Sequence, residues 1–138
     1  MTSTLNREAA TPSALNYDGG LTIAFSVADL AKSIAWYQDV LGFKLLYQVD
    51  EIGWCELQTE VEGGRVNVGL SKVEKPEVSG GPTPTFGVKD IDKARAILEA
   101  KKVRFDGATR EYPGMVRLAT FYDPDGNTLM LYQSLGQS

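Results

Sequence analysis

The residues TIAFSVADLAKS (22–33) occur a second time, in altered form, as TPTFGVKDIDKA (83–94). The offset between the two copies is 61 residues. The positions that are identical in both copies are Thr22/Thr83, Phe25/Phe86, Val27/Val88, Asp29/Asp90 and Lys32/Lys93. A repeat at fixed spacing indicates that one supersecondary unit is used twice. The sequence therefore predicts two similar modules, each covering part of the other's apolar surface.

The first copy predicts a strand, a helix and three further strands. Alternating apolar residues indicate the strands, and apolar residues at helical spacing after Asp29 indicate the helix. Asp29 is a favourable N-cap residue, and Gly42 favours a helix end. The predicted strands are Leu21–Val27, Phe43–Val49, Gly53–Thr59 and Arg65–Leu70.

The second copy predicts the same order of elements. Asp90 caps its helix, and the DPDGN sequence at 123–127 is a strong turn signal before the last strand. The predicted strands are Thr83–Val88, Val103–Ala108, Val116–Tyr122 and Thr128–Gln133. We therefore expect an α+β fold made of two βαβββ modules, at about residues 21–71 and 83–134. Residues 1–20 are interpreted as a polar N-terminal tail, and residues 21–138 as one domain.

Length, composition and charge limit the classes of function. The chain has 138 residues, of which 43% are hydrophobic and 23% charged, as in ordinary globular domains. The net charge of −4 and the lack of a long basic run argue against a nucleic-acid partner. No apolar stretch approaches membrane-spanning length, and residues 1–16 lack the apolar core of a signal peptide. The single cysteine, Cys55, excludes an intrachain disulfide framework. These features predict a cytoplasmic protein.

The two copies, the run VADLAKSIAWYQDVLGF (27–43) and the DPDGN turn (123–127) together resemble the vicinal oxygen chelate superfamily. This superfamily includes glyoxalase I, bleomycin-resistance proteins and extradiol dioxygenases. The resemblance covers about residues 21–134. It implies paired βαβββ modules whose mixed sheet curls around a shared pocket, and it implies little about the reaction, because one fold hosts many functions.

The resemblance also implies where metal-dependent relatives place their ligands. The matching positions here are Thr22, Thr83 and Met130, with the fourth at Asn67 or Val68, and the chain has no histidine. Zinc, nickel and iron sites of this type use imidazole or carboxylate donors, and threonine and methionine are poor substitutes. We therefore expect no metal site and no cofactor.

Strand alternation predicts which side chains line the pocket. The expected inward residues are Thr22, Ala24 and Ser26 in the first strand, Thr83, Thr85 and Gly87 in its repeat, and Thr128, Met130 and Tyr132 in the last strand. Small hydroxylated side chains leave room for a small organic ligand and offer it neutral hydrogen bonds. The alternative is that these small residues only allow two sheets to pack closely.

Other candidate ligand-binding residues carry charge or aromatic surface. Trp54, Glu56 and Gln58 share one strand face and could line the pocket mouth; alternatively they form an exposed polar face. Arg117 could bind a ligand carboxylate or phosphate, and the alternative is a surface ion pair. Glu56 is the best candidate for a catalytic acid or base.

Three classes of function are compatible with these residues. The first is a metal-free protein that binds a small organic molecule in a threonine-lined pocket, as the bleomycin-resistance branch does, often as a dimer; a homodimer is expected on this ground. The second is a lyase or dioxygenase with a shifted metal site or with Glu56 as acid or base. The third is an interaction module without a ligand.

Overall fold

The computed structural model describes residues 14, 18–77 and 80–136, and these form two modules. The first contains β1 (Gly20–Val27), α1 (Leu30–Leu41), β2 (Lys44–Val49), the short helix η1 (Asp50–Ile52), β3 (Trp54–Gln58) and β4 (Arg65–Lys72). The second contains β5 (Thr85–Gly87), α2 (Ile91–Ala100), β6 (Arg104–Phe105), β7 (Arg110–Tyr112), β8 (Val116–Tyr122) and β9 (Thr128–Ser134). The α+β class and the two modules are confirmed. Most of the predicted tail, residues 1–13 and 15–17, lies outside the described residues.

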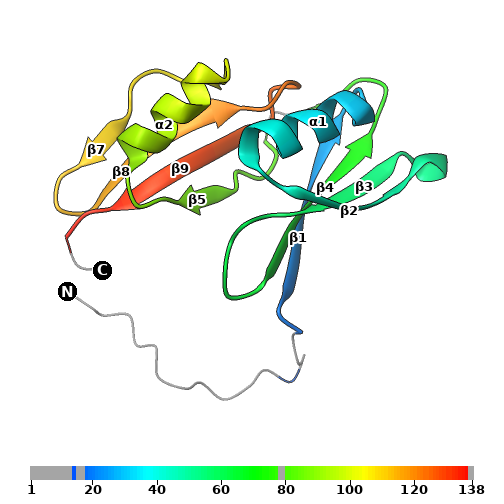
Figure 1. The fold of residues 1–138 in the computed structure, drawn as a ribbon, viewed down its shortest axis with the longest axis horizontal. Coiled ribbons are helices and arrows are strands. Elements are labelled where there is room, and N and C mark those ends of the chain that lie inside the picture. The colour runs from blue at the N-terminus through cyan, green and yellow to red at the C-terminus, as the bar shows by residue number, and fades with distance from the viewer. Residues whose placement is uncertain (1–13, 15–17, 78–79, 137–138) are drawn as a thin grey trace.

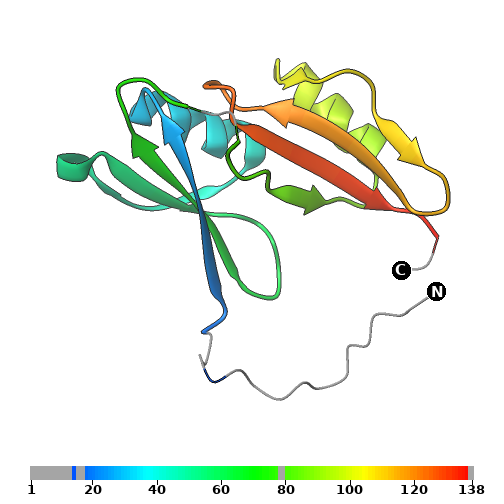
Figure 2. The same ribbon diagram turned by 180° about the vertical axis from the view of Figure 1, so that it is seen from behind.

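Each module forms its own sheet. The first sheet has the order β1-β4-β3-β2, and the second has the order β5-β9-β8-β6, with β7 also paired to β8. In both sheets the opening strand runs parallel to the last one, β1 to β4 and β5 to β9. Both helices lie on the same side of the molecule, above the sheets in Figures 1 and 2. Each sheet therefore has a face covered by its helix and a free face on the other side.

The strand register shows that the 61-residue repeat continues outside the segments 22–33 and 83–94. Phe25 pairs with Leu70 across β1 and β4, and Phe86 pairs with Leu131 across β5 and β9. Leu131 follows Leu70 by the same 61 residues that separate Phe86 from Phe25. Phe25, Leu70 and Leu131 are buried in the core, and Phe86 packs against it. The helix-covered faces of the two modules are thus built on one plan.

The two helices begin with the same cap. The carboxylate of Asp29 accepts a hydrogen bond from the backbone N–H of Lys32 at 3.0 Å, and that of Asp90 from Lys93 at 3.1 Å. Both bonds satisfy an amide that a helix start leaves without an internal partner. At the end of α1, Gly42 adopts a left-handed conformation with φ of 76°. The predicted caps and helix stop are confirmed.

The second module differs from the prediction at three strands: two are shorter than predicted, and β7 was not predicted. The predicted strand Thr83–Val88 forms only over Thr85–Gly87, because a proline N-terminal to it has no N–H for the ladder. Pro84 contributes only its carbonyl, which accepts the N–H of Met130 at 3.0 Å. The predicted strand Val103–Ala108 shortens to Arg104–Phe105.

The predicted single curled sheet around a shared pocket is also not formed within the chain. The two sheets are separate, and they do not close on one another. The residues predicted to line one pocket therefore lie on two open faces. No helix among the described residues is long and apolar enough to cross a membrane.

The turn between β8 and β9, residues 123–127, forms side-chain hydrogen bonds to the first module. We call it the junction turn. The Asp123 carboxyl group is buried and accepts the hydroxyl of Tyr37 in α1 at 2.9 Å. It also accepts the side-chain amide of Asn127 at 2.8 Å and the backbone N–H groups of Asp125 and Asn127. Burial raises the pKa of Asp123, and these hydrogen bonds offset the rise only in part. Burial and the neighbouring Asp123 carboxylate raise the pKa of Tyr37 well above its ordinary value, so its hydroxyl remains a donor.

Further contacts of the junction turn reach the start of α1. The Asp125 carboxylate accepts the backbone N–H of Ala28 at 3.1 Å and the hydroxyl of Ser33 at 3.3 Å. The Asn127 amide donates to the carbonyl of Ser26 at 3.0 Å. A turn of the second module therefore fixes the strand-to-helix corner of the first.

Candidate functional site

The free face of the first sheet carries a group of polar and aromatic side chains around Glu56. Along β3 the residues that point the other way, Cys55 and Leu57, are fully buried under the helix, so Trp54 and Glu56 project from the free face. In the neighbouring strands Thr22 pairs with Asn67, and Tyr47 of β2 pairs with Glu56. We call these five residues the Glu56 cluster: Thr22, Tyr47, Trp54, Glu56 and Asn67.

Hydrogen bonds connect all members of the Glu56 cluster. One carboxylate oxygen, Oε1, accepts the hydroxyl of Tyr47 at 2.8 Å. The other, Oε2, accepts the hydroxyl of Thr22 at 2.9 Å and the side-chain amide of Asn67 at 2.8 Å. The indole N–H of Trp54 donates to the Tyr47 hydroxyl at 3.0 Å. Four side chains from four different strands are thereby oriented by, or through, one carboxylate.

These contacts set the ionisation of Glu56. Partial burial by itself raises the pKa of this carboxyl group, but the hydrogen bonds from Asn67, Tyr47 and Thr22 together outweigh that effect. The pKa of Glu56 therefore lies below its ordinary value. The group is a carboxylate at neutral pH, and its affinity for a proton is lower than that of a free glutamate.

A glycine beneath Trp54 defines the position of the indole. The benzo ring of Trp54 fills the space over Gly69, where a Cβ atom would lie 2.1 Å from ring atom Cη2. Gly69 precedes Met130 by 61 residues, and both follow the same register within their sheets. The first-module counterpart of Met130 is therefore Gly69. The sequence had suggested Asn67 or Val68 for this position, and that prediction is wrong. Val68 points to the helix side and is fully buried.

The free face of the second sheet carries neutral side chains at the corresponding places. Thr85 pairs with Met130, and Gly87 pairs with Tyr132. The phenol of Tyr132 lies over Gly87, where a Cβ atom would meet the ring at 2.9 Å. The predicted residues Thr85, Met130 and Tyr132 are thus brought together on one face, as the alternation indicated.

Two predicted site residues lie apart from both groups. Arg117 is on the helix-covered face of β8, where its guanidinium binds both carboxylate oxygens of Asp92 at 3.0 Å. Glu111 lies 3.5 Å from its Nε atom. Of the two interpretations of Arg117, the structure shows the ion pair. Thr83 is exposed and precedes β5, so it is not part of the paired strand.

Tyr47 is the cluster member that strand alternation does not predict. The pairing of β2 with β3 shifts between Leu45 and Tyr47, which is a bulge in the strand. A bulge changes which face the following residues occupy, so simple alternation misplaces them. The sequence contains only a weak signal for this contact, namely a tyrosine in the strand that precedes the strand of Glu56.

The residues at the family's ligand positions do not suit a transition-metal ion. Thr22 and Met130 are weak donors for such ions, and Gly69 has no side chain. Within residues 14, 18–77 and 80–136 no three histidine, cysteine, aspartate or glutamate side chains are grouped closely enough to hold one. Glu56 is the nearest carboxylate to Thr22, and its oxygens already accept three hydrogen bonds.

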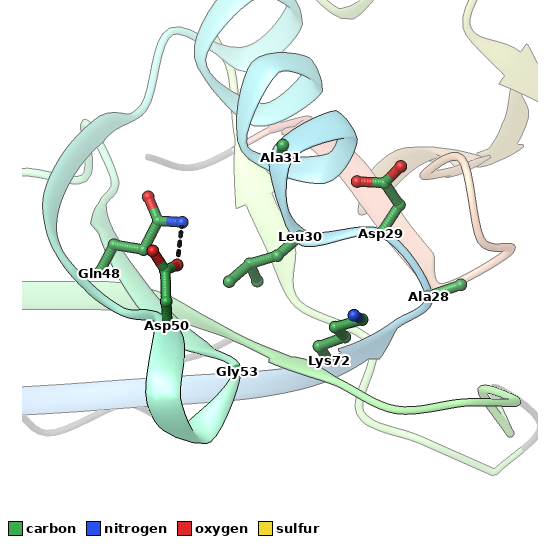
Figure 3. A pocket seen from close by; sticks show the side chains of 8 residues that line it. All are labelled: Ala28, Asp29, Leu30, Ala31, Gln48, Asp50, Gly53 and Lys72. Carbon is green, nitrogen blue, oxygen red and sulfur yellow. Dashed lines mark hydrogen bonds between the residues drawn. The ribbon is translucent and has the colours of Figure 1, made fainter.

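A separate cavity of about 450 Å³ opens at the start of α1 (Figure 3). Its lining residues are Ala28, Asp29, Leu30, Ala31, Gln48, Asp50, Gly53 and Lys72. Within it the Gln48 amide donates to the Asp50 carboxylate at 2.7 Å. None of the predicted site residues lines this cavity.

Comparison with known proteins identifies the family to which this chain belongs. Residues 21–131 match the family model of the Glyoxalase/Bleomycin resistance protein/Dioxygenase superfamily, and the chain belongs to this superfamily. It is 32% identical over 123 residues to the uncharacterized protein YaeR of Escherichia coli (strain K12), a match that covers 80% of this chain and 92% of YaeR.

Solved structures show the same fold. TnmS3, an antibiotic-binding protein from Streptomyces sp. CB03234, is 26% identical with a TM-score of 0.68, covering 86% of this chain and 97% of TnmS3. A lactoylglutathione lyase from Agrobacterium tumefaciens is 18% identical with a TM-score of 0.65, covering 82% of this chain and 91% of the lyase. The neighbours thus include a binding protein and an enzyme, so the fold alone does not select between these functions.

Proposed function

We propose that this chain is a metal-free protein that binds a small organic molecule at the free faces of its sheets. The observation that carries the proposal is the position of Trp54. Its ring fills the space over Gly69, which is the first-module counterpart of Met130. At this position metal-dependent relatives are expected to have a metal-ligating side chain. An aromatic ring and hydroxyl groups at this place suit the recognition of an organic molecule better than the coordination of an ion.

Acid-base catalysis by Glu56 is the weaker alternative. An efficient general base needs a pKa close to the working pH. The hydrogen bonds to Glu56 lower its pKa and so move it away from neutrality. We therefore assign Glu56 to the orientation of its neighbours and of a ligand, and not to proton transfer.

A homodimer is part of the proposal, because both sheet faces are open. Binding sites for small molecules commonly bury most of the ligand surface, which one open sheet face does not achieve. A second copy laid over the free faces supplies the missing wall. TnmS3 is an antibiotic-binding protein, and we expect a comparable organic ligand for this chain.

A cytoplasmic location is part of the same proposal. The lone thiol, Cys55, is fully buried, and burial raises its pKa to about 11. Such a thiol is neither a nucleophile nor available for a disulfide. A chain that forms no disulfide needs no oxidising compartment to fold.

The proposal is tested by metal analysis together with ligand titration. Purified protein is expected to hold far less than one transition-metal ion per chain by elemental analysis. Three-ring aromatic probes of different charge, namely proflavine, acridone and acridine-9-carboxylate, are titrated by fluorescence. At least one is expected to bind, and Thr22→Phe is expected to weaken that binding by about tenfold or more because the new ring fills the free face.

Thr83→Phe is the matched control, since it places the same ring at the equivalent position of the second module, outside the Glu56 cluster. It is expected to leave binding unchanged. One tightly held transition-metal ion per chain, or equal binding by wild type and Thr22→Phe, would contradict the proposal.

A further inference from the structure

We propose that the Glu56 cluster selects planar organic cations, meaning aromatic ligands that carry a positive charge and N–H donors. This inference rests on the proposed function and adds the chemical class of the ligand. It follows from the hydrogen-bonding groups that the cluster leaves unused, from its charge and from its two aromatic rings.

The donors of the Glu56 cluster are almost all engaged within the protein. The Trp54 indole N–H, the Tyr47 hydroxyl and the Thr22 hydroxyl each donate to another member. Each of these groups has only one hydrogen to donate, so none remains for a ligand. The Asn67 amide also donates to Glu56 and keeps one further N–H.

Acceptors, in contrast, remain free. A carboxylate offers about four lone-pair sites, and Glu56 uses three of them. The Thr22 hydroxyl oxygen and the Asn67 carbonyl oxygen accept no hydrogen bond from the described residues. A ligand that meets this surface is therefore matched when it brings donors.

The charge of the Glu56 cluster points in the same direction. Glu56 is its single carboxylic acid, and within the described part of the chain no lysine or arginine lies within 4.0 Å of it. Its lowered pKa keeps it ionised at neutral pH. A cationic ligand supplies the counter-charge that the protein itself does not place there, and charge-assisted hydrogen bonds are stronger than neutral ones.

The two rings of the cluster favour a flat cation. Tyr47 is 48% exposed, and Trp54 is partly exposed. Trp54 is held by its packing over Gly69 and by its hydrogen bond to Tyr47, so its orientation exists before a ligand binds. Cations are attracted to the faces of tryptophan and tyrosine, and a site organised in advance loses less entropy on binding.

The test compares the three probes on wild type, Glu56→Gln and Glu62→Gln. Proflavine is a flat cation with N–H donors, acridone is neutral, and acridine-9-carboxylate is an anion at pH 7.5. Wild type is expected to bind proflavine at least about tenfold more tightly than the other two probes. Glu56→Gln is expected to remove this preference by weakening proflavine binding about tenfold.

Glu62→Gln is the control for a general loss of negative charge, because Glu62 is exposed in the turn before β4. It is expected to bind all three probes as wild type does. Melting curves of both variants establish that they are folded. Should Glu56→Gln be unstable, a pH series on wild type replaces it: proflavine binding is expected to persist at neutral pH and to fall as the pH drops through the lowered pKa of Glu56.

Equal or tighter binding of the anion or the neutral probe by wild type would overturn the inference. So would a preference for proflavine that survives in Glu56→Gln. If the anion binds best and Thr22→Phe abolishes its binding, the proposed function stands and only the cationic class is wrong. If no probe binds, the inference is wrong; if one transition-metal ion is also held per chain, the proposed function itself is wrong.

Discussion

The two modules agree on the side that their helices cover and differ on the side that they leave free. Phe25 and Phe86 occupy equivalent core positions, as do Leu70 and Leu131. On the free faces, Glu56 pairs with Gly69, whereas Thr120 pairs with Met130, the counterpart of Gly69. One module therefore presents a carboxylate where the other presents a hydroxyl.

The difference shows which part of a duplicated unit is constrained. Core side chains pack at high density, so a change in volume is costly in either copy. Free faces carry no such constraint, and each copy is able to acquire its own chemistry. The free face of the first sheet carries a charged group, and the free face of the second carries only neutral ones at the corresponding places.

The strongest test of this comparison is the junction turn, which only the second module possesses. Asp123→Ala is expected to lower the free energy of unfolding by about 2–4 kcal/mol, because it leaves the buried Tyr37 hydroxyl and the Asn127 amide without their acceptor. Its counterpart 61 residues earlier is Glu62, which is exposed. Glu62→Ala is expected to change stability by less than about 0.5 kcal/mol. Urea unfolding measures both, and equal losses would remove the asymmetry.

A smaller effect is expected at the two glycines that lie under aromatic rings. Gly69→Ala places a methyl group against the Trp54 ring, and overpacking of this kind costs about 1–3 kcal/mol. Gly87→Ala meets the outer end of the Tyr132 phenol, which is able to move with less disturbance. Thermal unfolding should therefore show the larger loss for Gly69→Ala. The change in tryptophan fluorescence should likewise be larger in that variant, and the reverse order would mean that Trp54 is not fixed over Gly69.

The smallest effects are expected where the modules are alike. Asp29→Ala and Asp90→Ala each remove one helix cap, and each is expected to cost about 1 kcal/mol. Replacement by asparagine, which keeps an acceptor, should restore most of the loss in both variants. Urea unfolding of all four variants provides the comparison. A difference of more than about 1 kcal/mol between the two alanine variants would show that one cap also supports contacts outside its helix.

Much of the fold could be predicted from the repeat, because caps, glycine stops and alternation are local signals. The predicted strand Val116–Tyr122 has the observed bounds, and Asp29 and Asp90 cap their helices as expected. The separation of the two sheets was not predicted, because it depends on contacts between distant segments that no local pattern records.

The candidate site was predictable only in part for the same reason. Strand alternation puts Arg117 on the same face as Ala119 and Phe121, and both of these are buried on the helix side. The sequence left the ion pair of Arg117 open as one of two interpretations, because it did not show which face the helix would cover or that Asp92 would lie opposite. Tyr47 escaped prediction because a bulge moved it to the face of Glu56.

The contacts of the junction turn have a consequence for attempts to divide the chain. Two halves produced as separate polypeptides would each lack a hydrogen-bond partner that lies in the other half, such as the hydroxyl of Tyr37 or the carboxylate of Asp123. Each half would then have to leave these groups unpaired or open its core so that water reaches them. The two modules are therefore expected to fold as one unit and not as two independent ones.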